Sequence, residues 1–187
     1  YEISCSLVGS EMCIRDRFYD DVAFVYKNGL FSGTDSRSFS PNASMTRAML
    51  VTVLYRLEGE PTVTGRSSFT DVRSGAYYEK AVIWAAANGI VTGTDSTSFS
   101  PDAKVTREQL AAILYRYAQY RKLDTDASAK LNSFTDADSV SAYASEALGW
   151  AVSEGLINGA SGKLMPKGDA TRAPVSYTHL RAHETAA

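Results

Sequence analysis

The sequence predicts a mainly α-helical protein of three helix-loop-helix repeats packed on one another around a shared axis, with the third repeat truncated. Two observations carry this prediction: the chain resembles itself at a spacing of about 60 residues, and apolar residues within the copies recur at helical spacing. An apolar content of 44% is typical of a globular chain. A pair of short helices cannot bury its apolar faces alone, so we expect the copies to share a core. The alternative, a tandem of independent domains, is disfavoured because units of about 60 residues are marginally stable.

The two ends of the chain do not continue this pattern. Residues 1–17 and 174–187 resemble translated sequencing-adapter read-through, and we expect both to be artefacts outside the fold. The spacing of His179 and His183 would suit a zinc site, but we reject this interpretation because both lie in the adapter-like segment 174–187. Cys5 and Cys13 lie in the other adapter-like segment, 1–17, so residues 18–173 contain no thiolate or imidazole for catalysis or metal binding.

The repeats are read directly from recurring residues. The segment 33–41 recurs at 93–101, and Thr46-Arg47 returns as Thr106-Arg107. A more diverged third copy opens by repeating 68–71 at 133–136 and contains Thr171-Arg172. We therefore assign repeat 1 to residues 18–60, repeat 2 to 66–121 and repeat 3 to 131–173, with the front of repeat 1 and the last helix of repeat 3 missing.

Each repeat is expected to contain a helix, a structured loop and a second helix. In repeat 2, helical spacing predicts a first helix from about Tyr77 that stops at Gly89, followed by a loop over 93–102. Thr106 with Gln109 three residues later predicts a capping box at the start of the second helix. Linkers are expected near 58–67 and 119–132. The predicted apolar stripes of the second helices are Leu50, Val53, Leu54 and Leu57 in repeat 1, and Leu110, Ile113, Leu114 and Tyr117 in repeat 2.

These motifs resemble a known family. Phe69–Val72, the 77–89 helix, the Phe-Ser-Pro turn and Val105–Glu108 together are similar to an S-layer homology repeat. The signature before the second helix in that family is usually Ile-Thr-Arg-Ala-Glu; this chain keeps the arginine three times and the final glutamate in no copy. The resemblance implies a pseudo-threefold bundle whose grooves bind secondary cell-wall polysaccharide, often pyruvylated. It further implies non-covalent anchoring of a secreted or surface protein to a Gram-positive cell wall, with a cargo domain on another part of the parent chain.

Within that resemblance, the arginines of the signature are the principal ligand candidates. An arginine in the first turn of a helix, beside unpaired backbone N–H groups and the positive end of the dipole, suits a carboxylate. The alternative is that the arginines pair with an aspartate or cover apolar surface. The signature threonines are N-caps first and ligand contacts second, and the tryptophans suit the core better than a sugar platform. The predicted ligand-binding residues are Arg47, Arg107, Arg172, Thr46, Thr106, Thr171, Trp84 and Trp150.

Composition and charge disfavour other functions. A formal net charge of -2 gives no broad attraction to nucleic acid, and no apolar run is long enough for membrane insertion. Asp35, Asp95 and Asp102 lack the spacing of a calcium loop, so no metal and no cofactor are expected. Asp71 and Asp136 suit capping or turns, and no acid–base pair indicates an enzyme. The alternatives are a structural or protein-binding repeat without glycan binding, and the wall-targeting part of a larger hydrolase.

Overall fold

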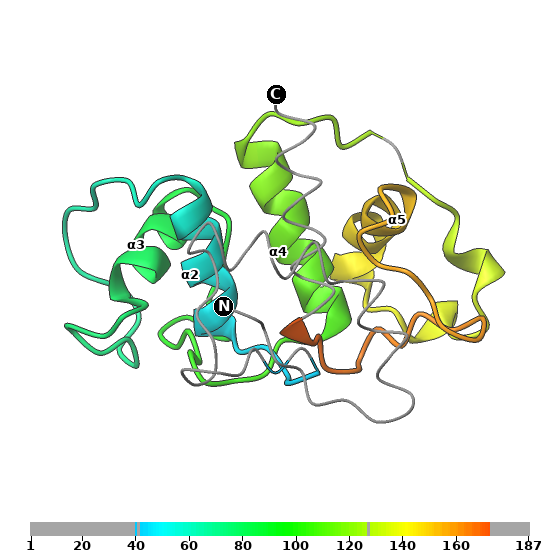
Figure 1. Cartoon of the computed structure of the whole chain (residues 1–187), viewed down its shortest axis with the longest axis horizontal. Coiled ribbons are helices and arrows are strands. Elements are labelled where there is room, and N and C mark those ends of the chain that lie inside the picture. The colour runs from blue at the N-terminus through cyan, green and yellow to red at the C-terminus, as the bar shows by residue number, and fades with distance from the viewer. Residues whose placement is uncertain (1–39, 41, 127, 173–187) are drawn as a thin grey trace, which may run out of the picture. The chain divides into compact units, whose positions relative to one another are not determined.

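The computed structural model describes residues 40, 42–126 and 128–172. The chain divides into a central unit, residues 45–170, and a flanking unit, residues 1–44 with 171–187. The described part is mainly α-helical, as predicted, with isolated β-bridges and no β-strand. The predicted artefact segments and the front of repeat 1 up to residue 39 lie outside the described residues. The helices, drawn in Figure 1, are α2 (Arg47–Leu57), α3 (Glu79–Ala87), α4 (Arg107–Tyr120) and α5 (Ser145–Ser153), with 3-10 turns at Leu131–Ser133, Ala137–Ser139 and Ala142–Ala144.

The helix ends follow the local sequence signals. Helix α3 begins two residues after Tyr77 and is followed by Gly89, whose φ of 68° is the left-handed conformation that terminates helices. At α4, the Thr106 side chain accepts from the Gln109 backbone N–H, and the Gln109 side chain accepts from the Thr106 N–H. The predicted capping box is therefore confirmed. Helix α4 continues to Tyr120, two residues into the predicted linker.

The helices pack across repeat boundaries. Helix α2 of repeat 1 packs against α3 of repeat 2, and α4 of repeat 2 packs against α5 of repeat 3, as Figure 1 also shows. The predicted stripe on α4 is fully buried, and that on α2 is buried except for Leu57, which is half-buried near the helix end. Because each of these packed pairs joins helices of two successive repeats, the repeats share a core.

A ring of backbone hydrogen bonds joins the three repeats at equivalent positions. The Met45 N–H donates to the carbonyl of Ala170 at 2.8 Å, the Val105 N–H to that of Met45 at 2.9 Å, and the Ala170 N–H to that of Val105 at 2.8 Å. Each residue directly precedes the threonine of its signature. The ring supports the pseudo-threefold packing, which remains a prediction for the bundle as a whole.

Candidate functional site

The segment that precedes each second helix meets the loop of the following repeat. We call the contact between the first turn of α2 and the repeat 2 loop the first junction, and that between the first turn of α4 and the repeat 3 loop the second junction. At the first junction, the Arg47 and Ala48 N–H groups donate to the carbonyls of Ala103 and Pro101, both at 3.0 Å. At the second, the Arg107 N–H donates to Gly168 at 2.9 Å. The first backbone N–H groups of both helices therefore donate to carbonyls of the next repeat, whereas our prediction assumed that these groups were unpaired.

The signature arginines hold the same loops with their side chains. Arg47 donates from Nε to the carbonyl of Phe99 and from Nη2 to that of Thr92, both at 2.7 Å. Its guanidinium also lies over the Phe99 ring, 4.6 Å from the centroid. Burial lowers the pKa of Arg47, which nevertheless stays protonated.

Arg107 repeats this arrangement one repeat further along. It donates from Nε to the carbonyl of Leu164 and from Nη2 to that of Asn158, both at 2.7 Å. Burial lowers its pKa as well. No ion pair among the described residues involves Arg47 or Arg107, so neutral carbonyls hold both cations.

The aspartate of each Phe-Thr-Asp segment fixes the same loop from within its own repeat. Asp71 accepts from the N–H groups of Phe99 and Ser100 at 2.8 and 2.7 Å, and Asp136 accepts from the two equivalent N–H groups of the repeat 3 loop at the same distances. These bonds hold Ser100 at a φ of 58°, a conformation that is costly outside glycine. The sequence suggested capping or a turn for these aspartates, whereas the bonds observed fasten a loop 28 or 29 residues further along the same repeat.

The threonines cap their helices. Thr46 and Thr106 are half-buried, and each side chain accepts from the N–H three residues later at 3.3 Å. In the flanking unit, Thr171 pairs with Ser44 in an antiparallel bridge, and the Arg172 N–H donates to the carbonyl of Ala43 at 3.1 Å. The Arg172 side chain is buried, which lowers its pKa.

The tryptophans lie in the core. Trp84 and Trp150 are each 5% exposed. Trp84 packs against Tyr55 and Tyr120 with ring centroids 5.8 and 5.7 Å apart, and Trp150 packs against Tyr115 at 5.6 Å. Of the two alternatives that the sequence left open, core packing is the one that this burial favours.

Two exposed tyrosines at the junctions were not singled out from the sequence. Tyr77 precedes α3 and is 62% exposed, whereas Tyr143 precedes α5 and is 57% exposed. They lie 66 residues apart, the same offset as Trp84 and Trp150, so they are repeat equivalents. Burial and then the charge of Asp102 raise the pKa of Tyr77, and Thr46 across the junction opposes them. The recurrence of a tyrosine ahead of both first helices was the signal available in the sequence.

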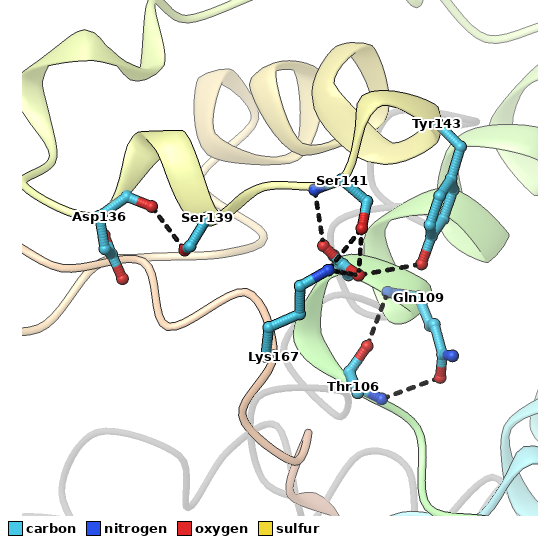
Figure 2. Close-up of polar contacts among 8 residues, drawn as sticks. Thr106, Gln109, Asp136, Ser139, Ser141, Tyr143 and Lys167 are labelled. Atoms are coloured by element: carbon cyan, nitrogen blue, oxygen red, sulfur yellow. Dashed lines mark hydrogen bonds and ion pairs between the residues drawn. The ribbon is translucent and has the colours of Figure 1, made fainter.

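A buried glutamate at the second junction was also missed. Glu108 is 4% exposed, and its carboxylate accepts hydrogen bonds from Ser141, Tyr143 and Lys167 of repeat 3. Figure 2 shows these three side chains converging beside the Thr106–Gln109 capping box. Burial raises the pKa of Glu108, but the hydrogen bonds outweigh burial and leave it below the usual range. Its neighbour Tyr143 has a pKa raised to about 12, first by burial and then by the Glu108 charge.

Metal and membrane sites were also sought in the described residues. No group of three or more potential metal ligands occurs in residues 40, 42–126 and 128–172. Over the same part of the chain, no helix has the length and apolar character needed to span a bilayer.

Comparison with known proteins decides the family. The model of the S-layer homology domain matches residues 16–48, 68–111 and 133–173, which together make up more than half of the chain. The chain belongs to the S-layer homology family. The three matched segments correspond to the three repeats, and the junctions described above are therefore contacts between successive S-layer homology repeats.

The relatives are much longer proteins. An endoglucanase of Bacillus sp. (strain KSM-635) is 32% identical over 79% of this chain, which covers 16% of that protein. An amylopullulanase of Thermoanaerobacterium thermosulfurigenes is 31% identical over 86% of the chain, covering 9% of it. A surface-layer 125 kDa protein of Lysinibacillus sphaericus is 31% identical over 83%, covering 13% of it. The chain thus spans less than a fifth of each relative's length and matches a module common to enzymes and surface-layer proteins.

Family membership fixes the general role of this segment. As an S-layer homology module, it is a binding module that serves in anchoring at the bacterial cell wall, and its location is the cell surface. The enzymes among the relatives are enzymes as whole chains, whereas the matched segment corresponds to their S-layer homology part.

Proposed function

We propose that this chain anchors a longer parent protein, with its cargo domain elsewhere, by binding secondary cell-wall polysaccharide at its repeat junctions. The observation that carries the proposal is the pair of exposed, repeat-equivalent rings of Tyr77 and Tyr143. A tyrosine offers an apolar face for the C–H groups of a sugar and a hydroxyl for its oxygens. Both rings belong to the repeat that follows the junction helix, so a glycan on them would contact two repeats at once.

The finer proposal is that the bound polysaccharide carries ketal-linked pyruvate. Each described junction contains a guanidinium held by carbonyls rather than by a carboxylate, so its positive charge is not cancelled by an ion pair. Such a charge in a partly desolvated setting attracts an anion over several ångströms. We place Arg47 and Arg107 in this role, and Arg172 by its equivalent sequence position.

The remaining predicted ligand residues support the junction in this proposal. The half-buried threonine hydroxyls of Thr46 and Thr106, and Thr171 by sequence equivalence, fix the start of the second helix and stand near the proposed glycan. Trp84 and Trp150 act from the core by supporting the first helices against which the second helices pack.

Co-sedimentation of the full chain with purified sacculi tests the proposal. Walls from a pyruvylated Gram-positive source should retain the chain, and walls stripped of pyruvate should retain much less. Tyr77→Ala and Tyr143→Ala should each weaken retention, whereas Tyr120→Ala, at the opposite end of α4 from the junction, should not. A folded wild-type chain that stays in the supernatant with every wall type would refute glycan anchoring and favour a protein partner.

A further inference from the structure

The second junction contains a complete set of donors for a carboxylate. Glu108 Oε2 accepts from the Ser141 backbone N–H at 3.1 Å, and Oε1 accepts from the Ser141 hydroxyl at 3.0 Å and the Tyr143 hydroxyl at 3.2 Å. Lys167 Nζ donates to Oε1 at 2.7 Å and also to the Ser141 hydroxyl. A backbone N–H, two hydroxyls and an ammonium form the kind of donor set that binds a carboxylate strongly.

These donors lie at the surface, although the carboxylate that they bind does not. The side chain of Glu108 is 5% exposed, whereas that of Lys167 is 57% exposed, as is Tyr143. Figure 2 shows Lys167 and Tyr143 approaching from different segments of repeat 3, with Ser141 between them. The chain's own glutamate therefore occupies a carboxylate site that borders solvent.

The first junction has no such occupant. The position of Glu108 in the signature is taken there by Ala48, which is 0% exposed. The position of Lys167, directly after the loop proline, is taken by Asp102, which is exposed. Of the residues in the Glu108 cluster, only the tyrosine is common to both junctions, because Tyr77 stands where Tyr143 does. The two junctions therefore have the same framework and different charges.

We infer that Glu108 is a specificity-determining residue that closes the second junction to acidic ligand groups. This inference rests on the proposed function for the nature of the ligand and narrows it: the acidic group of the polysaccharide is assigned to the first junction, beside Arg47, and Arg107 holds the loop of a junction that takes neutral sugar. A ligand carboxylate at the second junction would find Lys167 and Ser141 already bonded and would meet the like charge of Glu108. Neutral sugar hydroxyls are not subject to this repulsion, so the exposed ring of Tyr143 stays available to them.

The test removes the Glu108 carboxylate by substitution and adds a small free carboxylate, pyruvate. Glu108→Ala places at the second junction the residue that the first junction has, and it leaves Ser141, Tyr143 and Lys167 without their acceptor. Sodium pyruvate is titrated into the full-length variant and wild type, with sodium chloride at equal ionic strength as reference, and amide and lysine resonances are followed by NMR. Saturable binding at Ser141 and Lys167 is expected for the variant, with affinity at least about tenfold above wild type. Adding Lys167→Met should abolish it.

A matched control and a second variant keep the result decisive. Glu146→Ala removes an exposed carboxylate that accepts from Tyr115 at 3.0 Å, and it should gain no pyruvate binding because Glu146 forms no ion pair among the described residues. If Glu108→Ala does not fold, Glu108→Gln keeps the side-chain volume and leaves the Lys167 ammonium without its counter-charge, so weaker pyruvate binding at Lys167 is expected. The inference is overturned if wild type binds pyruvate as tightly as the folded variant, or if neither variant gains binding.

The two proposals fail in different assays. The pyruvate titration contains no wall material, so it reports on the second junction whether or not the chain binds sacculi. A chain that sediments with walls but gains no pyruvate binding on substitution contradicts the role of Glu108 alone. A chain that gains pyruvate binding but never sediments contradicts the anchoring proposal alone.

Discussion

Replacing Arg107 should release the repeat 3 loop from α4. In Arg107→Ala, the carbonyls of Leu164 and Asn158 lose charge-assisted hydrogen bonds of 2.7 Å each. The bond to Leu164 is partly buried and contributes about 2 kcal/mol, whereas the bond to Asn158 is exposed and contributes about 1 kcal/mol. We therefore expect the free energy of unfolding to fall by about 3 kcal/mol.

The assay is urea unfolding of the full chain followed by tryptophan fluorescence, because Trp84 and Trp150 are both buried in the core. Arg73→Ala serves as the control: Arg73 is exposed, and its removal should change the free energy of unfolding by less than about 0.5 kcal/mol. Arg107→Lys should recover at most about half of the loss, because one ammonium replaces a fork that reaches two carbonyls six residues apart.

Equal stability of Arg107→Ala and Arg73→Ala would refute this reasoning. It would mean that the backbone bonds, Glu108 and Asp136 hold the loop without the guanidinium, and that the arginine is available to a ligand as the sequence first suggested. A large loss of stability for Arg107→Ala together with full wall retention at low temperature would instead separate the structural role of the arginine from ligand binding.

Three further predictions test the rest of the junction. Asp71→Ala should lower the free energy of unfolding by about 2 kcal/mol, because two backbone N–H groups lose a charged acceptor. Urea unfolding measures this against Asp138→Ala, which removes an exposed carboxylate and should have little effect. Gly159→Ala should lower the free energy of unfolding by about 1–3 kcal/mol, since its Cβ would clash with the Phe134 ring, and a melting temperature equal to wild type would contradict the packing. The pKa of Glu108 lies below its usual range, so its stabilisation is present at neutral pH and lost as pH falls through that lowered pKa. The melting temperatures of wild type and Glu108→Gln should therefore differ at neutral pH and converge in acid, below the ordinary range of a glutamate.

Features that depend on nearby residues were predictable from the sequence. The capping box at Thr106 and Gln109 needs only a threonine and a glutamine three residues apart, and the end of α3 needs only a glycine that accepts a positive φ. The apolar stripe of α4 follows from helical periodicity. In each case the partner lies within one or two helical turns, so the sequence contains the whole interaction.

The arginine contacts were beyond sequence reasoning for a physical reason. Arg47 and Arg107 bond to backbone carbonyls, which every residue has, so no side-chain pattern marks the acceptors. The first N–H groups of α2 and α4 likewise donate to carbonyls 53 to 61 residues further along the chain. Recurrence of the arginine showed that it matters to each repeat, but not whether it serves the neighbouring repeat or a ligand.

The Glu108 cluster was hidden by the repeats themselves. Comparison of the copies emphasises what they share, whereas Glu108 and Lys167 occur at positions where the first junction has Ala48 and Asp102. An ion pair of 2.7 Å between residues 59 positions apart becomes visible only once the repeats are packed. Differences between equivalent positions are thus the place to look for specificity in a repeat protein.

The junction geometry also determines which substitutions can identify a ligand contact. An arginine that fastens a loop will reduce wall binding when replaced, even if it never touches the glycan, because the loop it releases belongs to the same junction. Tyr77 is the cleaner probe, since most of its side chain faces solvent, whereas Tyr143 also donates to Glu108, so Tyr143→Phe should be compared with Tyr143→Ala. A glycan that spans a junction contacts two repeats, so binding should stabilise the fold by linkage. Loss of that ligand-induced stabilisation in a folded tyrosine variant, with the arginines in place, would locate the glycan on the rings.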